Sequence, residues 1–386
     1  MREIYMDNSA TTPLSFAAKE KMSEAMEVFG NPSSLHSAGQ EAQKLVDEAR
    51  VRLLSALGVR QRQGSFIFTS CGTEATSLAL FGCAYAKTRR DATRILTTDS
   101  EHPSVVRALD RLSLDGFEIV KIPTKNGILD KTTLKKALDK KIFLATFMLV
   151  NNETGAIYDV WSAFSEIKRA YPDAITHCDA VQGFMKIPFT PVSLHADLIT
   201  VSGHKLHAPK GVGGLYISAE MLKAKKIIPY LVGGGQENGM RSGTENVIGI
   251  SAFGASVNDI MGRRAEISKK LSELRSYAEE RLSELDVRIN RPSGEYLPSI
   301  INITLPSIKS ETMLHHLSAD GIYVSSGSAC SSHSAHPSES LIAFGLNPKE
   351  ADCSLRISLS EYNEKEDIDA LVDSLSTGLE RLVRIK

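Results

Sequence analysis

The sequence predicts an α/β protein with a mostly parallel sheet covered by helices, followed by a smaller α/β domain. Short β-branched and aromatic runs alternate with helical segments, as at 66–69 and 75–86. A strand, a turn of small residues and a helix form the unit from which parallel sheets are built. The 386 residues are too many for one ordinary core. We therefore expect a large domain over 14–258 and a small domain over 259–386, onto which residues 1–13 pack.

The elements of the large domain are expected in this order. Apolar residues at helical spacing predict helices over 16–29 and 38–57, each of which ends at a glycine. Helical stretches also lie between several of the later strands, for example at 161–170. After the strand and helix named above, β-branched runs predict further strands at 94–97, 141–150, 175–179, 197–201 and 214–217.

The pattern changes after about residue 258. A long charged helix is expected over 262–284, and two more helices over 337–344 and 364–383. Strands are expected near 299–304 and 322–325. This mixture predicts the smaller α/β domain.

Composition excludes several classes of protein. A net charge of −1 provides no basic field for a nucleic-acid backbone. No apolar run approaches the roughly 18 residues of a membrane helix, and residues 1–8 lack the apolar stretch of a signal peptide. The five cysteines include no CxxC pair, which argues against a disulfide framework or a thiolate metal site. We expect a cytoplasmic protein with reduced thiols and no metal.

Polar residues follow two expected strands at their carboxyl ends, where α/β sheets bind ligands. Asp179 ends the strand 175–179. It could cap the following helix, or it could keep the nitrogen of a pyridine ring protonated. Lys205 comes shortly after the strand 197–201, in the segment 202–205. A lysine in such a loop is usually solvated, but one at the end of a buried strand is a Schiff-base candidate.

Two further strand ends carry candidate residues. The turn 69–73 leads into a helix N-terminus, whose free N–H groups and dipole favour a phosphate, although the turn could be a simple helix cap. His102 follows the strand 94–97, and Pro103 holds its loop extended. The imidazole could be structural, or it could stack on a flat cofactor and carry protons near neutral pH.

Two loops and one strand complete the candidate residues. The glycine-rich loop 233–246 could be simply mobile, or it could deliver Arg241 or Thr244 to an anion, for example across a subunit interface. Cys330 lies in a loop of small residues without apolar anchors, which predicts an exposed, mobile and reactive thiol. Arg356 interrupts an apolar strand and needs an anion, either a protein carboxylate or that of a substrate.

In combination these segments resemble the cysteine desulfurases of the NifS/IscS type. These enzymes form part of class V of the fold-type-I pyridoxal-phosphate (PLP) enzymes. The similarity covers nearly the whole chain, and the order and number of the matching segments make it specific. The segments are 5–13, 30–34, 101–102, 150–155, 179–182, 202–205, 241–244, 326–330 and 355–358.

The resemblance implies a role for each matching residue. Lys205 matches the lysine that binds PLP covalently, Asp179 the partner of the ring nitrogen and His102 the stacking histidine. Cys330 matches the cysteine that accepts sulfur. The remaining matches concern the phosphate (Gly72, Thr73, Ser202, His204 and Thr244 of a second subunit), the ring hydroxyl (Gln182) and the substrate with its carboxylate (Asn152 and Arg356).

The implied activity is the conversion of L-cysteine to L-alanine, with transfer of sulfur to Cys330 as a persulfide. A homodimer that passes sulfur to acceptor proteins, such as an iron–sulfur scaffold, is expected. The alternatives are a selenocysteine lyase, an aminotransferase of the same fold, or an inactive scaffold for sulfur carriers. One departure from the family pattern is Cys71, which places an unexpected thiol at the phosphate turn.

Overall fold

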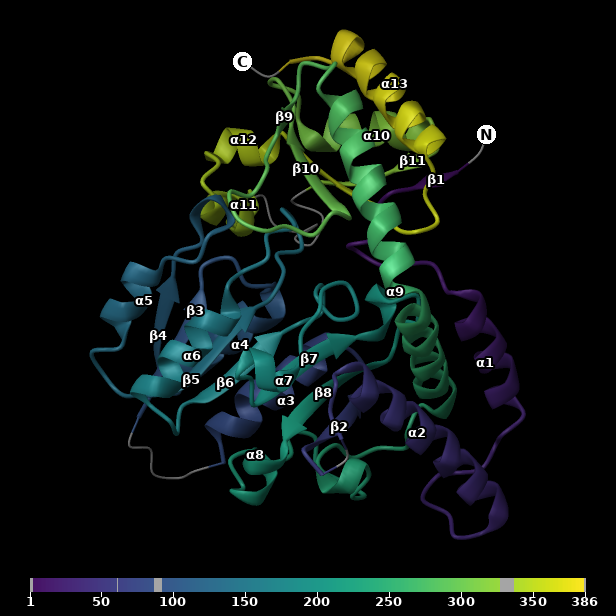
Figure 1. Ribbon diagram of the computed structural model, residues 1–386, viewed down its shortest axis with the longest axis vertical. Helices are drawn as coiled ribbons and strands as arrows, with labels where there is room; N and C mark the ends of the chain where they lie inside the picture. Colours follow the sequence, from purple (N-terminus) through teal and green to yellow (C-terminus); the bar gives the residue numbers. More distant parts are fainter. Residues whose placement is uncertain (1–2, 61, 87–91, 327–336, 385–386) are drawn as a thin grey trace.

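The computed structural model describes residues 3–60, 62–86, 92–326 and 337–384. Two parts of unequal size are joined by the helix α9 (Val247–Leu282), and both chain ends lie at the smaller part (Figure 1). Among the residues that the structure describes, none of the helices is long and apolar enough to cross a membrane.

The larger part is built on one sheet with the strand order β2-β8-β7-β6-β5-β3-β4. Strand β8 runs antiparallel to both of its neighbours, and the other neighbouring pairs are parallel. The prediction of a mostly parallel sheet is therefore confirmed. The strands are β2 (Gly64–Thr69), β3 (Arg94–Thr98), β4 (Glu118–Ile122), β5 (Ile142–Met148), β6 (Ile175–Asp179), β7 (Leu198–Ser202) and β8 (Gly213–Ser218).

Helices cover both faces of this sheet, because its strands are apolar on both sides. On β5, Phe147 packs into a core with α2, α6 and the first half of α9. Leu144 of the same strand belongs to the opposite core, with α3, α4 and α8. The helices of this part are α1 (Phe16–Met26), α2 (Ser37–Ala56), α3 (Gly72–Ala84), α4 (Pro103–Leu114), α5 (Lys131–Ala137), α6 (Val160–Ala170), α7 (Pro191–Leu194) and α8 (Ala219–Lys223), with short 3₁₀ turns η1 (Lys125–Gly127), η2 (Gly203–Lys205) and η3 (Glu237–Gly239).

The smaller part has its own core and a sheet of order β12-β13-β10-β9. The N-terminal segment belongs to it, because β1 (Ile4–Tyr5) pairs with β11 (Ile322–Tyr323) and Asp7 bridges to Ser358. The other elements are β9 (Arg288–Ile289), β10 (Ile300–Thr304), β12 (Ser325–Ser326), β13 (Ser354–Ser358), α10 (Ser310–Ala319), α11 (Glu339–Phe344), α12 (Pro348–Asp352) and α13 (Lys365–Arg381).

The helix α9 is 36 residues long and connects the two cores. Its first half contributes Phe253 and Val257 to the core of the larger part, and its second half contributes Leu274 and Leu282 to that of the smaller part. The expected helix 262–284 is its second half. The proposed domain boundary at 258/259 falls inside it.

Candidate active site

A cavity of about 260 Å³ lies where β5, β6 and β7 end and α3 begins. Because the carboxyl ends of parallel strands meet at one edge of a sheet, the polar residues that follow them converge there. The cavity brings together most of the site residues expected from the sequence, namely Gly72, Thr73, His102, Asn152, Asp179, Gln182, Ser202, His204 and Lys205.

Lys205 ends the 3₁₀ turn η2, directly after β7. Its Nζ donates to the backbone carbonyl oxygens of Ser9 and Ala10, the second at 2.8 Å. The N-terminal segment therefore forms one wall of the cavity beside the lysine. Sequence reasoning missed the contribution of Ser9 and Ala10, because their backbone oxygens carry no side-chain signal.

Asp179 ends β6 with its side chain buried. Burial raises the pKa of its carboxyl to about 6, although the Val181 N–H at 3.0 Å and the charge of Lys205 act in the opposite direction. Asp179 therefore does cap the following turn, through the hydrogen bond that it accepts from the Val181 N–H. A buried carboxylate in this position also favours a cationic partner, as the second interpretation requires.

The N-terminus of α3 forms a cradle suited to an anion. Cys71 precedes the helix without a side-chain cap, so the first N–H groups receive no such partner. A Cβ at Gly72 would lie 3.2 Å from Val181 Cγ2 and 3.3 Å from Ser202 Cβ, so the chain is closely packed at this turn. The Oγ of Ser202 is buried and has no hydrogen-bond partner among the described residues. A helix of 13 residues and an unsatisfied hydroxyl together fit a phosphate group.

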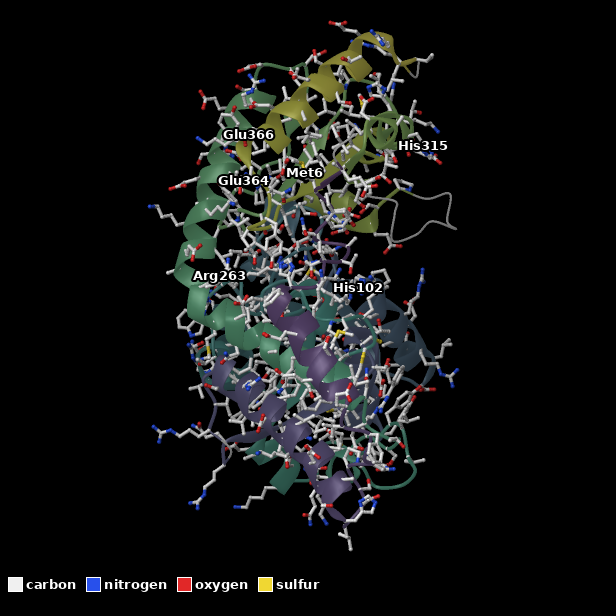
Figure 2. All side chains as sticks on the ribbon, turned by 90° about the vertical axis from the view of Figure 1, so that its right-hand side faces the viewer. Met6, His102, Arg263, His315, Glu364 and Glu366 are labelled. Carbon is white, nitrogen blue, oxygen red and sulfur yellow. The ribbon has the colours of Figure 1, made fainter. Side chains whose placement is uncertain are left out.

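His102 caps α4, because its Nδ1 accepts from the Ser104 N–H at 3.1 Å. Burial, followed by the charge of Lys205, lowers the pKa of the imidazole to about 4. The ring is therefore neutral at pH 7, and the Nδ1 bond assigns its proton to Nε2. A role of His102 in proton transfer stays a prediction. Figure 2 shows His102 at the level where the two parts of the molecule meet.

Two more cavity residues are held by neighbours. Gln182 donates from Nε2 to the Ser9 carbonyl at 2.9 Å. His204 lies 3.3 Å from Thr11 Oγ1 through Nδ1, and burial with the nearby charge of Lys205 lowers its pKa to about 4. A neutral His204 would approach a phosphate as a hydrogen-bond donor rather than as a cation.

Three expected residues are absent from this group. Arg356 lies outside the lining of the cavity and bonds Asp7 and the Asn152 carbonyl. Thr244 is exposed on the surface of its own chain. Cys330, with the loop predicted to be mobile, lies outside the described residues.

Glu101 is a neighbour of the cavity that the sequence singled out only through the pair 101–102. Its Oε1 accepts from Thr98 Oγ1 at 2.6 Å and from the Met148 N–H at 2.8 Å. Burial raises the pKa of this carboxyl to about 8, so that it is largely protonated at pH 7. Its Oε2 has no partner among the described residues.

The cysteines differ in their surroundings. Cys83, Cys178 and Cys353 are buried, as expected for small apolar residues. Cys71 is partly exposed and lines the cavity, so the unexpected thiol does lie at the phosphate turn. No group of three or more His, Cys, Asp or Glu suited to a metal ion occurs in the described parts of the chain.

The sequence matches the family model described as aminotransferase class-V over residues 4–371. With a lysine, a buried aspartate and an anion cradle in one cavity, this match defines the class of protein. The chain belongs to the class-V aminotransferases and is a PLP-dependent enzyme.

Within this family the chain is similar to cysteine desulfurases. It is 39% identical to the cysteine desulfurase IscS of Dictyoglomus turgidum, over 99% of this chain and 95% of the relative. A solved structure of a NifS-like protein superposes with a TM-score of 0.91 at 34% identity and covers 99% of this chain and 100% of the other. A structure of SspA in complex with cysteine has a TM-score of 0.81 at 27% identity, over 94% and 100% of the two chains.

The cavity residues fit PLP. The unsatisfied Ser202 hydroxyl and the uncapped α3 N-terminus suit its phosphate. Buried Asp179 suits the protonated ring nitrogen, and Lys205 at the cavity wall suits the aldehyde carbon.

Proposed function

We propose that the enzyme converts L-cysteine to L-alanine and transfers the sulfur to Cys330. The observation that carries this proposal is the meeting of Lys205 and buried Asp179 in one cavity beside the phosphate cradle. That arrangement argues against an inactive scaffold, which would need neither residue. The relative solved with cysteine supports the choice of substrate.

The cofactor would be held by residues at each of its ends. Gly72, Thr73, Ser202 and His204 would bind the phosphate, whereas Asp179, Gln182 and His102 would contact the ring. When bound, PLP withdraws electrons from the Cα of the substrate. Asp179 would maintain this capacity because its carboxylate keeps the ring nitrogen protonated.

Lys205 would carry the proton of the substrate Cα. As a free amine, its Nζ would be the base at this wall of the cavity. In its ammonium form, the Nζ bonds the carbonyl oxygens of Ser9 and Ala10. These acceptors would hold Lys205 in place after it has taken up the proton.

Cys330 would attack the substrate sulfur as a thiolate. A sulfur–sulfur bond forms as the Cβ–S bond breaks, and the electron pair left on the substrate takes up a proton to give alanine. We propose that His102 donates a hydrogen bond from Nε2 to the substrate sulfur, which withdraws electron density from that sulfur and favours the attack by Cys330. This hydrogen bond requires the ring proton on Nε2, where the contact between the Ser104 N–H and Nδ1 places it.

A homodimer would complete the site. Arg241 bonds Glu74 of α3 at 2.6 Å, which ties the loop carrying Thr244 to the helix at the phosphate cradle. Thr244 itself is exposed, and the nearby Tyr230 and Val232 are exposed by 52% and 75%. An exposed apolar segment beside this loop supports an interface with a second copy, whose Thr244 would reach the phosphate.

Acceptor proteins, such as an iron–sulfur scaffold, and a cytoplasmic location are part of the same proposal.

The decisive experiment follows sulfur and carbon together. The purified enzyme, loaded with PLP and given L-cysteine with a reductant, should release alanine and sulfide in equal amounts. After a pulse of cysteine without reductant, mass spectrometry should find one added sulfur on the peptide that contains Cys330. Cys330→Ala should keep the cofactor but release almost no alanine, whereas the control Cys71→Ala, which removes the second thiol without adding a hydroxyl that could cap α3, should remain active.

Three results would contradict the proposal. The added sulfur could appear on Cys71, which would move the acceptor to the phosphate turn. Cys330→Ala could make alanine and sulfide at the wild-type rate, which would indicate a lyase that forms no protein persulfide. A keto acid in place of alanine would indicate an aminotransferase.

A further inference from the structure

Gln182 is held from both sides in the cavity wall. Its Oε1 accepts from Lys186 Nζ at 3.0 Å, and its Nε2 donates to the Ser9 carbonyl at 2.9 Å. The Ser9 carbonyl oxygen can only accept, so it requires the amide nitrogen on its side, and Lys186 Nζ carries hydrogens to donate to the amide oxygen whether or not it is charged. The two contacts therefore agree on one orientation of an amide that could otherwise be turned over.

This orientation determines what Gln182 offers to a ligand. An amide nitrogen carries two hydrogens, and Ser9 uses one of them. The other is available to a ligand in the cavity that Gln182 lines. If the amide were reversed, its oxygen would face two acceptors, the Ser9 carbonyl and a ligand oxygen. In this orientation Gln182 presents a hydrogen-bond donor to a ligand in the cavity.

Lys186 occupies a costly environment for a cation. Burial lowers the pKa of its ammonium to about 7, the positive charge of Lys205 contributes, and Glu361 opposes the shift. Within the described residues no carboxylate lies within salt-bridge distance of its Nζ, and its recorded hydrogen bond is the one to Gln182. Lys186 also lines a second cavity, of about 70 Å³, together with Arg264. An apolar side chain would fill this place at a lower cost in solvation.

We propose that Lys186 is a positioning residue that fixes the Gln182 amide with an N–H toward the cavity, so that the site selects a ligand with an acceptor oxygen on its ring. The inference rests on the proposed function, in which that ligand is PLP and the oxygen is its ring hydroxyl in the deprotonated form. Lys186 touches neither ligand nor substrate in this scheme. It acts through Gln182.

The test compares two ligands that differ in this one oxygen. PLP and 3-deoxypyridoxal 5′-phosphate, which lacks the ring hydroxyl, are titrated into the cofactor-free full-length enzyme by fluorescence or calorimetry. The wild type should prefer PLP by at least about tenfold, the range expected for one hydrogen bond to a charged oxygen. Both Lys186→Met and Gln182→Leu should reduce this preference several-fold.

The double variant distinguishes positioning from a direct effect of charge. If Lys186 acts through Gln182, then Lys186→Met should change the preference little in the Gln182→Leu background. Lys186→Arg, which keeps charge and donors, should restore part of the preference. Lys168→Met, which removes a lysine that bonds Asp197 away from the cavity, should retain all of it. Lys186→Gln serves in place of Lys186→Met if that variant fails to fold.

Two outcomes would overturn this inference and leave the proposed function intact. Lys186→Met could weaken the binding of both ligands equally, or it could reduce the preference for PLP as much in the Gln182→Leu background as in the wild type. A wild-type enzyme that binds neither ligand would instead contradict the proposed function, and the inference with it.

Discussion

Arg356 on β13 donates from Nη2 to Asp7 Oδ1 at 2.7 Å, across 349 positions of sequence. Its Nη1 donates to the carbonyl oxygen of Asn152 at 3.1 Å, and its buried Nε has no partner among the described residues. The anion that an arginine in an apolar strand requires is thus supplied by the protein. A substrate carboxylate would have to share this guanidinium with Asp7, or to displace it.

Arg356→Lys should weaken cysteine binding more than it slows turnover. Lysine keeps the charge but loses the planar fork that binds two oxygens at once. We expect the KM for cysteine to rise about tenfold or more, as for the loss of one charged hydrogen bond, with a smaller change in kcat. Steady-state kinetics measure both quantities.

Asp7→Asn separates the two functions of Arg356. It removes the competing carboxylate, so the KM should stay the same or fall while thermal stability decreases. An unchanged KM in Arg356→Lys, with a similar loss of stability in both variants, would identify the pair as a structural salt bridge.

Lys205→Ala should lower turnover by at least about 10²–10⁴-fold and leave cofactor binding detectable. The variant lacks the base for the Cα proton, a contribution of about 10²–10⁴-fold, whereas Asp179 and the phosphate cradle remain. Borohydride reduction of the wild type followed by peptide mapping should find the pyridoxyl group on Lys205. A label on the exposed Lys210, five positions along the same segment, would contradict the assignment.

Glu101→Gln should make the cofactor-free protein more stable, relative to wild type, as the pH rises from about 5 to 8. Because burial raises the Glu101 pKa from 4.5 to about 8, the folded state keeps a proton that the unfolded state has released. The wild type therefore loses up to about 1.4 kcal/mol of stability per pH unit in this window. Glutamine does not titrate, and its oxygen can accept from Thr98 and Met148.

Chemical denaturation of both proteins at several pH values measures this difference. The control Glu20→Gln, on the exposed side of α1, should follow the wild type. A constant difference between Glu101→Gln and wild type from pH 5 to 8 would show that Glu101 is ionised throughout.

A mixture of Lys205→Ala and Thr244→Ala chains should regain activity if Thr244 serves the partner subunit. One site of each heterodimer then combines an intact Lys205 with an intact Thr244, so about half of the wild-type activity per heterodimer is expected. Lys205→Ala mixed with Asp179→Asn is the control, because both residues line the cavity of one chain and each site keeps a lesion. No recovery in the first mixture would place Thr244 outside the shared site.

Most of the sheet could be predicted because its buried strands are rich in β-branched and aromatic residues. The exception is β4, an edge strand whose Glu118 and Lys121 are exposed and interrupt the apolar pattern. The first half of α9 was also missed, because Gly249 and Gly254 do not favour a helix. A Cβ at Gly254 would lie 2.8 Å from Ala49, so its glycine serves the close packing of α9 on α2.

The site residues also divide into those that a local pattern reveals and those that depend on distant contacts. Asp179 and Lys205 could be predicted because the carboxyl ends of parallel strands meet at one edge of the sheet, independently of the conformation of the loops. The pairing of Arg356 with Asp7 depends on the packing of the N-terminal segment against β13, which no local sequence pattern predicts. The contact of Lys186 with Gln182 could not be predicted either, because a lysine four positions after Gln182 is usually solvated.

The N-terminal wall of the cavity has a consequence for biosynthesis. Residues 4–10 leave the ribosome early, but the strand β13, to which Asn8 is bonded at 2.9 Å, is synthesised about 350 residues later. A nascent chain that has already folded its large sheet would therefore present Lys205 without the Ser9 and Ala10 carbonyls that hold it. Productive cofactor capture would therefore have to wait until β13 has been made and has fixed the N-terminal segment.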